Sequence, residues 1–89
     1  MDKQELHEAI EQLHAELNRV ESSDSNQWEI LQKVVSDIQK MLARQGQTTE
    51  HYRGLGERLR EAVAQLEASH PEATLRMRQV IDQLAYMGI

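Results

Sequence analysis

The residues of this chain whose types and spacing come nearest to chemistry are two Glu-x-x-His pairs, Glu11 with His14 and Glu67 with His70. A carboxylate and an imidazole three residues apart share one face of a helix, and two such pairs with two further glutamates are the ligands of di-metal four-helix bundles. Here, however, Glu11 falls on the side of its helix opposite the apolar residues, and His70 stands beside a helix-breaking proline. We therefore expect these side chains to be solvated rather than to bind a metal.

A second grouping of possible ligands is His7, Glu11 and His14, spaced i, i+4 and i+7. Such a surface cluster binds zinc weakly, because it has no fourth ligand and no supporting hydrogen bonds. The sequence contains no Ser/His/Asp or Cys/His arrangement, no P-loop, no dinucleotide-binding fingerprint and no cysteine. We expect no enzyme activity, no catalytic residues, no cofactor and no bound metal.

The element that would carry the first of these pairs is a helix over about residues 2–21. Its apolar residues are spaced +4, +3, +4 and +3, which places them on one narrow stripe of an α-helix. This stripe is the first candidate helix seam or interface, and it consists of Leu6, Ile10, Leu13, Leu17 and Val20.

A second helix is predicted over about residues 25–45, with Asp24 as its N-cap and Gln27 at position N3. Further apolar residues widen its stripe, so we expect this helix to face more than one neighbour and to be the most buried element. The short connection predicts that the first two helices form an antiparallel, coiled-coil-like hairpin. The stripe of this helix, the second candidate seam or interface, consists of Trp28, Leu31, Val35, Ile38 and Leu42.

Two more helices are predicted over about residues 49–69 and 71–87. Pro71 separates them, because proline is accepted in the first turn of a helix but breaks its interior, and Gly88 suits the position after the last turn. A single kinked helix in place of these two is the alternative. The predicted fold is therefore all-α, a small antiparallel helical bundle in one domain over residues 1–89, because no stretch alternates as a strand would.

Acidic residues outnumber basic ones by fifteen to ten, and the excess is concentrated near the N-terminus. Residues 2–21 hold six acids and two bases, a charge that opposes nucleic acid, whose affinity for proteins comes largely from Lys and Arg. No run approaches the roughly 18 apolar residues of a membrane span, and the first residues lack the features of a signal peptide. We expect neither nucleic acid nor membrane as a partner, and a cytoplasmic location.

Four segments carry a likeness to a known family: Met1–His7, Glu57–Val63, Ser69–Pro71 and Leu84–Ile89. In these segments, and over essentially its whole length, the chain is similar to short bacterial proteins grouped as domain of unknown function 4404. Ser25 departs from the pattern, which has proline after the capping aspartate. The resemblance implies a bacterial source and a helical fold, and it implies no activity and no functional residues.

The leading functional hypothesis is a non-catalytic structural or protein-interaction module that self-associates, most simply as a dimer, since so short a chain leaves little core to bury every apolar face. One alternative is a small regulator that binds another protein through its acidic first helix or a hydrophobic groove. A Met-rich groove for an apolar ligand and a metal-binding carboxylate bundle are the weaker alternatives.

Overall fold

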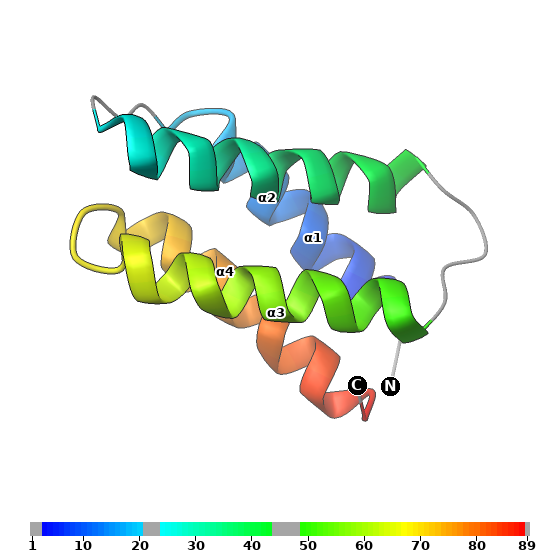
Figure 1. Cartoon of the computed structure of the whole chain (residues 1–89). Helices are drawn as coiled ribbons and strands as arrows, with labels where there is room; N and C mark the ends of the chain where they lie inside the picture. Colours follow the sequence, from blue (N-terminus) through cyan, green and yellow to red (C-terminus); the bar gives the residue numbers. More distant parts are fainter. Residues whose placement is uncertain (1–2, 21–23, 44–48, 89) are drawn as a thin grey trace.

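A computed structural model describes residues 3–20, 24–43 and 49–88, and the described residues form four α-helices and no strand, which confirms the all-α class. The chain runs up and down through the helices in order, so that each helix packs beside its neighbours in sequence and the last packs beside the first (Figure 1). α2 and α3 lie antiparallel in one layer, and α1 and α4 cross behind them in a second layer. The helices are α1 (Lys3–Leu17), α2 (Ser25–Ala43), α3 (Thr49–Leu66) and α4 (Pro71–Tyr86).

α2 begins as the sequence predicts. Asp24 is the N-cap, and its carboxylate Oδ1 accepts hydrogen bonds from the backbone N–H groups of Asn26 at 2.9 Å and Gln27 at 3.1 Å. These bonds satisfy two of the amide donors that the first turn of any helix leaves without an intrahelical partner.

The start and end of α4 also follow local rules. Pro71 is its first residue, with His70 at the N-cap, and the buried Thr74 hydroxyl donates to the Pro71 carbonyl at 3.0 Å. Gly88 follows the last turn at φ +77°, a left-handed conformation that residues with a Cβ rarely adopt. α3 and α4 are therefore two separate helices, not one kinked helix.

α1 ends earlier than its apolar stripe suggests. The backbone N–H groups of Arg19 and Val20 donate to carbonyls three residues back, at 3.0 and 3.3 Å, so the chain tightens out of the α-helix after Leu17. Val20 therefore lies beyond the helix, where it is only partly buried. The predicted starts at residues 25, 49 and 71 coincide with the first residues of α2, α3 and α4, and the predicted ends at residues 69 and 87 lie three residues and one residue beyond the observed ends. The predicted limits at residues 2, 21 and 45 lie outside the described part of the chain.

The core is almost purely aliphatic, and α4 is at its centre. α4 packs more extensively against α1 and α3 than α2 packs against either of its neighbours. The expectation that the second helix is the most buried is therefore wrong, and the main partner of α1 is α4 rather than the other half of the predicted hairpin. The buried hydrophobic side chains are Leu6, Ile10, Leu13, Leu17, Leu31, Val34, Ile38, Leu55, Leu59, Ala62, Leu66, Ala73, Met77, Val80 and Leu84.

The close contact between α3 and α4 includes a buried glycine. Gly56 is buried, and a Cβ at that position would meet Leu84 Cδ1 at 3.3 Å, tighter than nine in ten real Cβ contacts. A glycine that weakens a helix by its backbone entropy thus permits close approach of the neighbouring helix here.

Candidate interaction surface

One side of α2 keeps a row of apolar side chains partly open to solvent. Trp28, Val35 and Leu42 are spaced by seven residues, and a helix drifts only about 20° over each such step, so the three share one side. Trp28 is 45% exposed, and Val35 and Leu42 are partly buried. We call these three residues the outer stripe of α2; they are the members of the predicted α2 seam that the chain does not fully cover.

The outer stripe runs along the α1 side of α2 and ends in a hollow. Leu42 borders this hollow of about 260 Å³ together with Leu6 and Ile10 of α1. Tyr52 from the first turn of α3 and Met41 of α2 add apolar surface to its wall. The remaining lining residues are Gln4 and His7. This end of the α1–α2 seam is therefore a recess with a mostly apolar lining.

The residues of α2 on the solvent side of the outer stripe carry no charge. Gln32, Ser36 and Gln39 occupy the adjoining solvent-facing positions of α2, and all three are exposed. Charged residues make up 28% of the whole chain, so this uncharged border differs from the average composition of the chain. Depletion of charge around exposed aromatic and aliphatic side chains is typical of the central part of protein interfaces.

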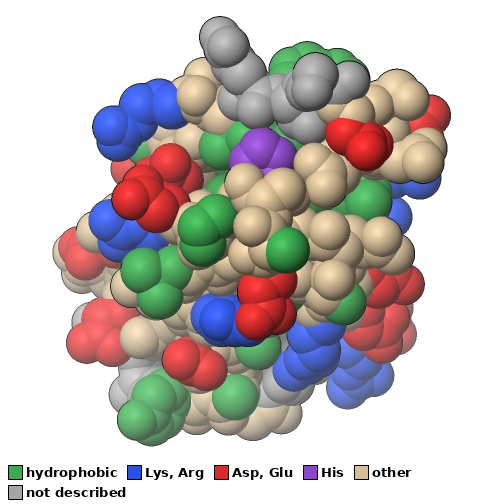
Figure 2. Space-filling view, turned by 90° about the vertical axis from the view of Figure 1, so that its left-hand side faces the viewer, with side chains coloured by type: hydrophobic (Ala, Val, Ile, Leu, Met, Phe, Trp, Pro, Cys, Tyr) green, Lys and Arg blue, Asp and Glu red, His purple; other side chains and the backbone are tan. Residues whose placement is uncertain are grey.

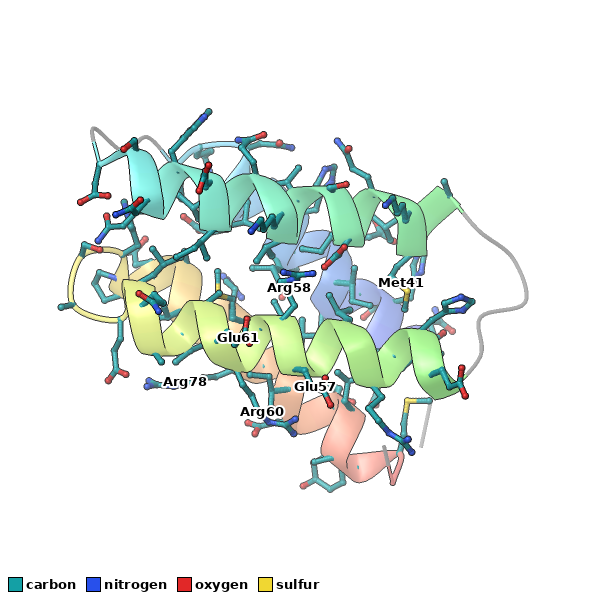
Figure 3. All side chains as sticks on the ribbon, viewed as in Figure 1. Met41, Glu57, Arg58, Arg60, Glu61 and Arg78 are labelled. Carbon is teal, nitrogen blue, oxygen red and sulfur yellow. The ribbon has the colours of Figure 1, made fainter. Side chains whose placement is uncertain are left out.

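The other side of α2 differs in character. Arg58 projects from α3 toward α2, where its Nε donates to the Asp37 Oδ2 at 3.0 Å, while Met41 projects from α2 toward α3 (Figure 3). Two hollows, of about 270 and 390 Å³, lie along this α2–α3 groove, and Arg58 lines both. Charged lining residues of both signs are present in equal number, namely Asp37, Glu50, Glu61, Lys33, Lys40 and Arg58. The groove is thus charged and bridged by an ion pair.

The outer face of α4 exposes the other two large apolar side chains found among the described residues, Leu75 (53%) and Tyr86 (72%). They lie eleven residues apart, which is about 16 Å along a helix. The exposed Arg78 and Asp82 stand on the same face between them. These apolar side chains are isolated by charge and do not form a continuous patch.

The Glu-x-x-His pairs do not assemble into a metal site. Glu11 Oε1 is paired with Nε2 of His7 at 2.7 Å, and Glu67 Oε2 with Arg78 at 2.9 Å, so both carboxylates are directed away from the pattern's histidines. The Nε2 atoms of His14 and His70 are buried and have no hydrogen-bond partner. Among the described residues, no three His, Asp or Glu side chains are grouped so that they could hold a metal ion.

Both buried imidazole atoms belong to the same end of the bundle, where α1 ends and α4 begins. An end-on view of the molecule shows one histidine near the top of this end, among hydrophobic and uncharged side chains, with charged side chains below and to the sides (Figure 2). No described carboxylate forms an ion pair with His14 or His70. These histidines are packing residues of the end of the bundle.

The ten candidate seam or interface residues divide into two groups. The six that lie inside the bundle are Leu6, Ile10, Leu13, Leu17, Leu31 and Ile38, and the four that stay partly open are Val20, Trp28, Val35 and Leu42. Val34, one of the further apolar residues that widen the predicted α2 stripe, is fully buried, whereas Val35 of the stripe itself stays partly open. The seven-residue spacing within the predicted stripe is the signal that separates the open residues of α2 from the buried ones.

None of the helices in the described part of the chain combines the length and apolar character needed to cross a bilayer. A family model described as a domain of unknown function (DUF4404) matches residues 6–89. No curated protein and no solved structure matches the chain.

Proposed function

The chain belongs to the DUF4404 family, a domain of unknown function, and for it we propose the role of a small non-catalytic interaction module that associates with a second copy of itself through the outer stripe of α2. The observation that carries this proposal is the exposure of Trp28, at 45%, in line with two more apolar residues on an uncharged side of α2. Tryptophan is the side chain most enriched among residues that dominate binding energy at interfaces.

The stripe of α1 is not the surface used. Leu6, Leu13 and Leu17 are at most 6% exposed because α4 and α2 cover them, so they could meet a second chain only if the bundle opened. Self-association of the folded chain therefore depends on the apolar side chains that the bundle leaves exposed. The outer stripe is an open apolar surface, and the α2 residues next to it on the solvent side are uncharged.

The test compares the association of the wild-type chain with that of two single variants by sedimentation equilibrium over micromolar to millimolar concentration. We expect a reversible dimer, weakened by about 2 kcal/mol or more, roughly 30-fold in the dissociation constant, in Trp28→Ser. Leu75→Ser is the matched control, because it removes an exposed apolar side chain from the outer face of α4. Circular dichroism of both variants checks that each keeps its helical content.

Trp28 also provides its own optical readout, because it is the single tryptophan of the chain. Its emission is expected to shift to shorter wavelength as concentration rises and the indole leaves water. A wild-type chain that sediments as a monomer at millimolar concentration would contradict the proposal. So would an equal loss of association in Leu75→Ser and Trp28→Ser.

A second candidate function is the binding of a different protein through the outer face of α4, favoured by the exposure of Leu75 and Tyr86. It predicts a wild-type monomer at every concentration and an emission maximum of Trp28 that dilution does not change. It also predicts that Leu75→Ser and Tyr86→Ser leave stability nearly unchanged, since neither side chain is buried. The sedimentation experiment therefore separates the two candidates.

A further inference from the structure

Two hollows adjoin at the end of the bundle where α1 and α3 begin and α2 ends (Figure 1). One is the recess of about 260 Å³ beside Leu42, and the other is the hollow of about 270 Å³ in the α2–α3 groove. Met41 lines both hollows, and its side chain projects from α2 toward α3 (Figure 3). Met41 is therefore the wall that the two hollows share.

This shared wall is a side chain that moves easily. Methionine is unbranched and has three rotatable side-chain bonds, so it adapts to the space around it. Met41 is only partly buried, whereas Met77 of the core is fully buried. Each hollow alone is smaller than the roughly 300 Å³ at which ligand pockets begin, but the two together exceed that size once Met41 turns aside.

The recess side of this joined space is suited to an apolar group. An apolar cavity of roughly 150 Å³ is sufficient to bind benzene, so the recess has room for an aromatic ring system or a short alkyl chain. Besides Met41, its lining residues are Leu6, Ile10, Leu42 and Tyr52, with Gln4 and His7 as the polar members.

The groove side is suited to a carboxylate. Lys40 of α2 is exposed there and forms no ion pair with a described residue. Arg58 of α3 donates its Nε–H to Asp37 at 3.0 Å, and its guanidinium carries further N–H donors on the Nη atoms. A carboxylate thus finds cationic donors on both walls, whereas a cationic group would find Glu50 as the one described lining carboxylate that Arg58 does not engage.

We propose that this end of the bundle binds a small carboxylate with an apolar body. The body fills the recess, Met41 turns aside, and the carboxylate lies between Lys40 and Arg58. The site does not depend on the self-association proposed above, because it is formed within one chain.

The first experiment titrates the full-length chain with 2-naphthoate and with decanoate, which carry an aromatic and an aliphatic body on the same head group. Carbon-13 labels on the methyl groups of the four methionines report where each probe binds. We expect a dissociation constant of about 1 mM or tighter for at least one probe, as is usual for ligands of this size. The methyl signal of Met41 should shift while that of the buried Met77 stays in place. No binding of either probe, or binding that leaves the Met41 signal unchanged, would overturn the proposal.

The position of the carboxylate is tested by removing one positive charge at a time. Lys40→Gln should raise the dissociation constant of the bound probe roughly fivefold, as for one exposed ion pair. Lys33→Gln is the matched control, because Lys33 is an exposed lysine of the same helix that lines the other hollow of the groove. The neutral 2-naphthamide should bind the wild type and Lys40→Gln equally well. Equal weakening by the two lysine variants would show that only the overall charge matters and would overturn the placement of the carboxylate.

A filling variant tests the site without altering its charge. Gly54 lines the groove hollow, and a Cβ built there has no atom within 4 Å, so Gly54→Leu adds a side chain in open space. Leucine is also a stronger helix former than glycine, so this variant should fold, which circular dichroism checks. We expect Gly54→Leu to weaken probe binding at least tenfold, whereas Gly54→Ala, which adds one methyl group, should change it by less than twofold. Binding by Gly54→Leu as tight as that of the wild type would overturn the site.

Discussion

α4 and α2 have similar lengths and similarly spaced apolar residues, yet the bundle uses them differently. α4 packs closely against α1 and α3, and its inward-facing side chains are buried from Ala73 to Leu84. α2 packs less extensively against both of its neighbours, and hollows follow it on both sides. From this difference we infer that α1, α3 and α4 contribute most of the free energy of folding, whereas α2 contributes mainly exposed surface.

The comparison is tested most strongly by the same substitution in both helices. Leu84→Ala in α4 should lower the free energy of unfolding by roughly 2–5 kcal/mol, because Leu84 is 1% exposed and its removal leaves a cavity. Leu42→Ala in α2 should cost about 1 kcal/mol, because Leu42 is only partly buried and already borders a hollow. Urea unfolding, followed by circular dichroism at concentrations where the chain is monomeric, measures both.

Equal losses of unfolding free energy in the two variants would mean that α2 is as well packed as α4. The inference that α2 contributes mainly surface would then be wrong. Amide hydrogen exchange offers an independent check of the same point. Exchange from the central amides of α2 is expected to be faster than from those of α4, because local opening follows packing.

Local structure was predictable from the sequence wherever neighbouring residues decide it. The Asp24 cap, the start of α4 at Pro71 and the left-handed Gly88 each follow from the bonding or backbone freedom of one residue type. The early end of α1 was not predictable, because the apolar spacing continues to Val20 after the helical hydrogen bonds have stopped.

The relative burial of the helices could not be predicted from the width of an apolar stripe. A wide stripe such as that of α2 shows that several neighbours are available, but how closely they approach depends on the residues of those neighbours. Gly56 lets α3 approach Leu84 of α4, whereas Arg58 stands between α3 and α2. This packing decides which residues of the candidate surface stay open. Because the apolar spacing alone does not reveal it, the sequence-based prediction placed Trp28 and Val35 in the seam.

The two glycines of α3 sharpen the comparison, since one faces each neighbour. Gly54 lines the groove toward α2 and has open space where a Cβ would be, so Gly54→Ala should stabilise the fold by about 1 kcal/mol through helix propensity. Gly56→Ala gains the same propensity but sets its Cβ 3.3 Å from Leu84 Cδ1, which cancels much of the gain. Thermal unfolding of the two variants measures the difference.

The glycine comparison has a clear contrary result. If Gly56→Ala stabilised the chain as much as Gly54→Ala does, the α3–α4 contact would have room for the added Cβ. The close packing that distinguishes α4 from α2 would then be absent at this point.

The smallest expected effect belongs to the ion pair that joins α2 to α3. Asp37 and Arg58 are bonded at 3.0 Å, but their side chains are 30% and 40% exposed, so solvent screens the attraction. A double-mutant cycle of Asp37→Asn and Arg58→Gln should give a coupling energy of about 0.5 kcal/mol that falls further in 1 M salt. Such a value places the contribution of this ion pair well below that of one buried leucine in α4. A coupling energy of several kcal/mol that persists in salt would instead make α2 a firmly fixed part of the bundle, and its role as a lightly held surface element would have to be abandoned.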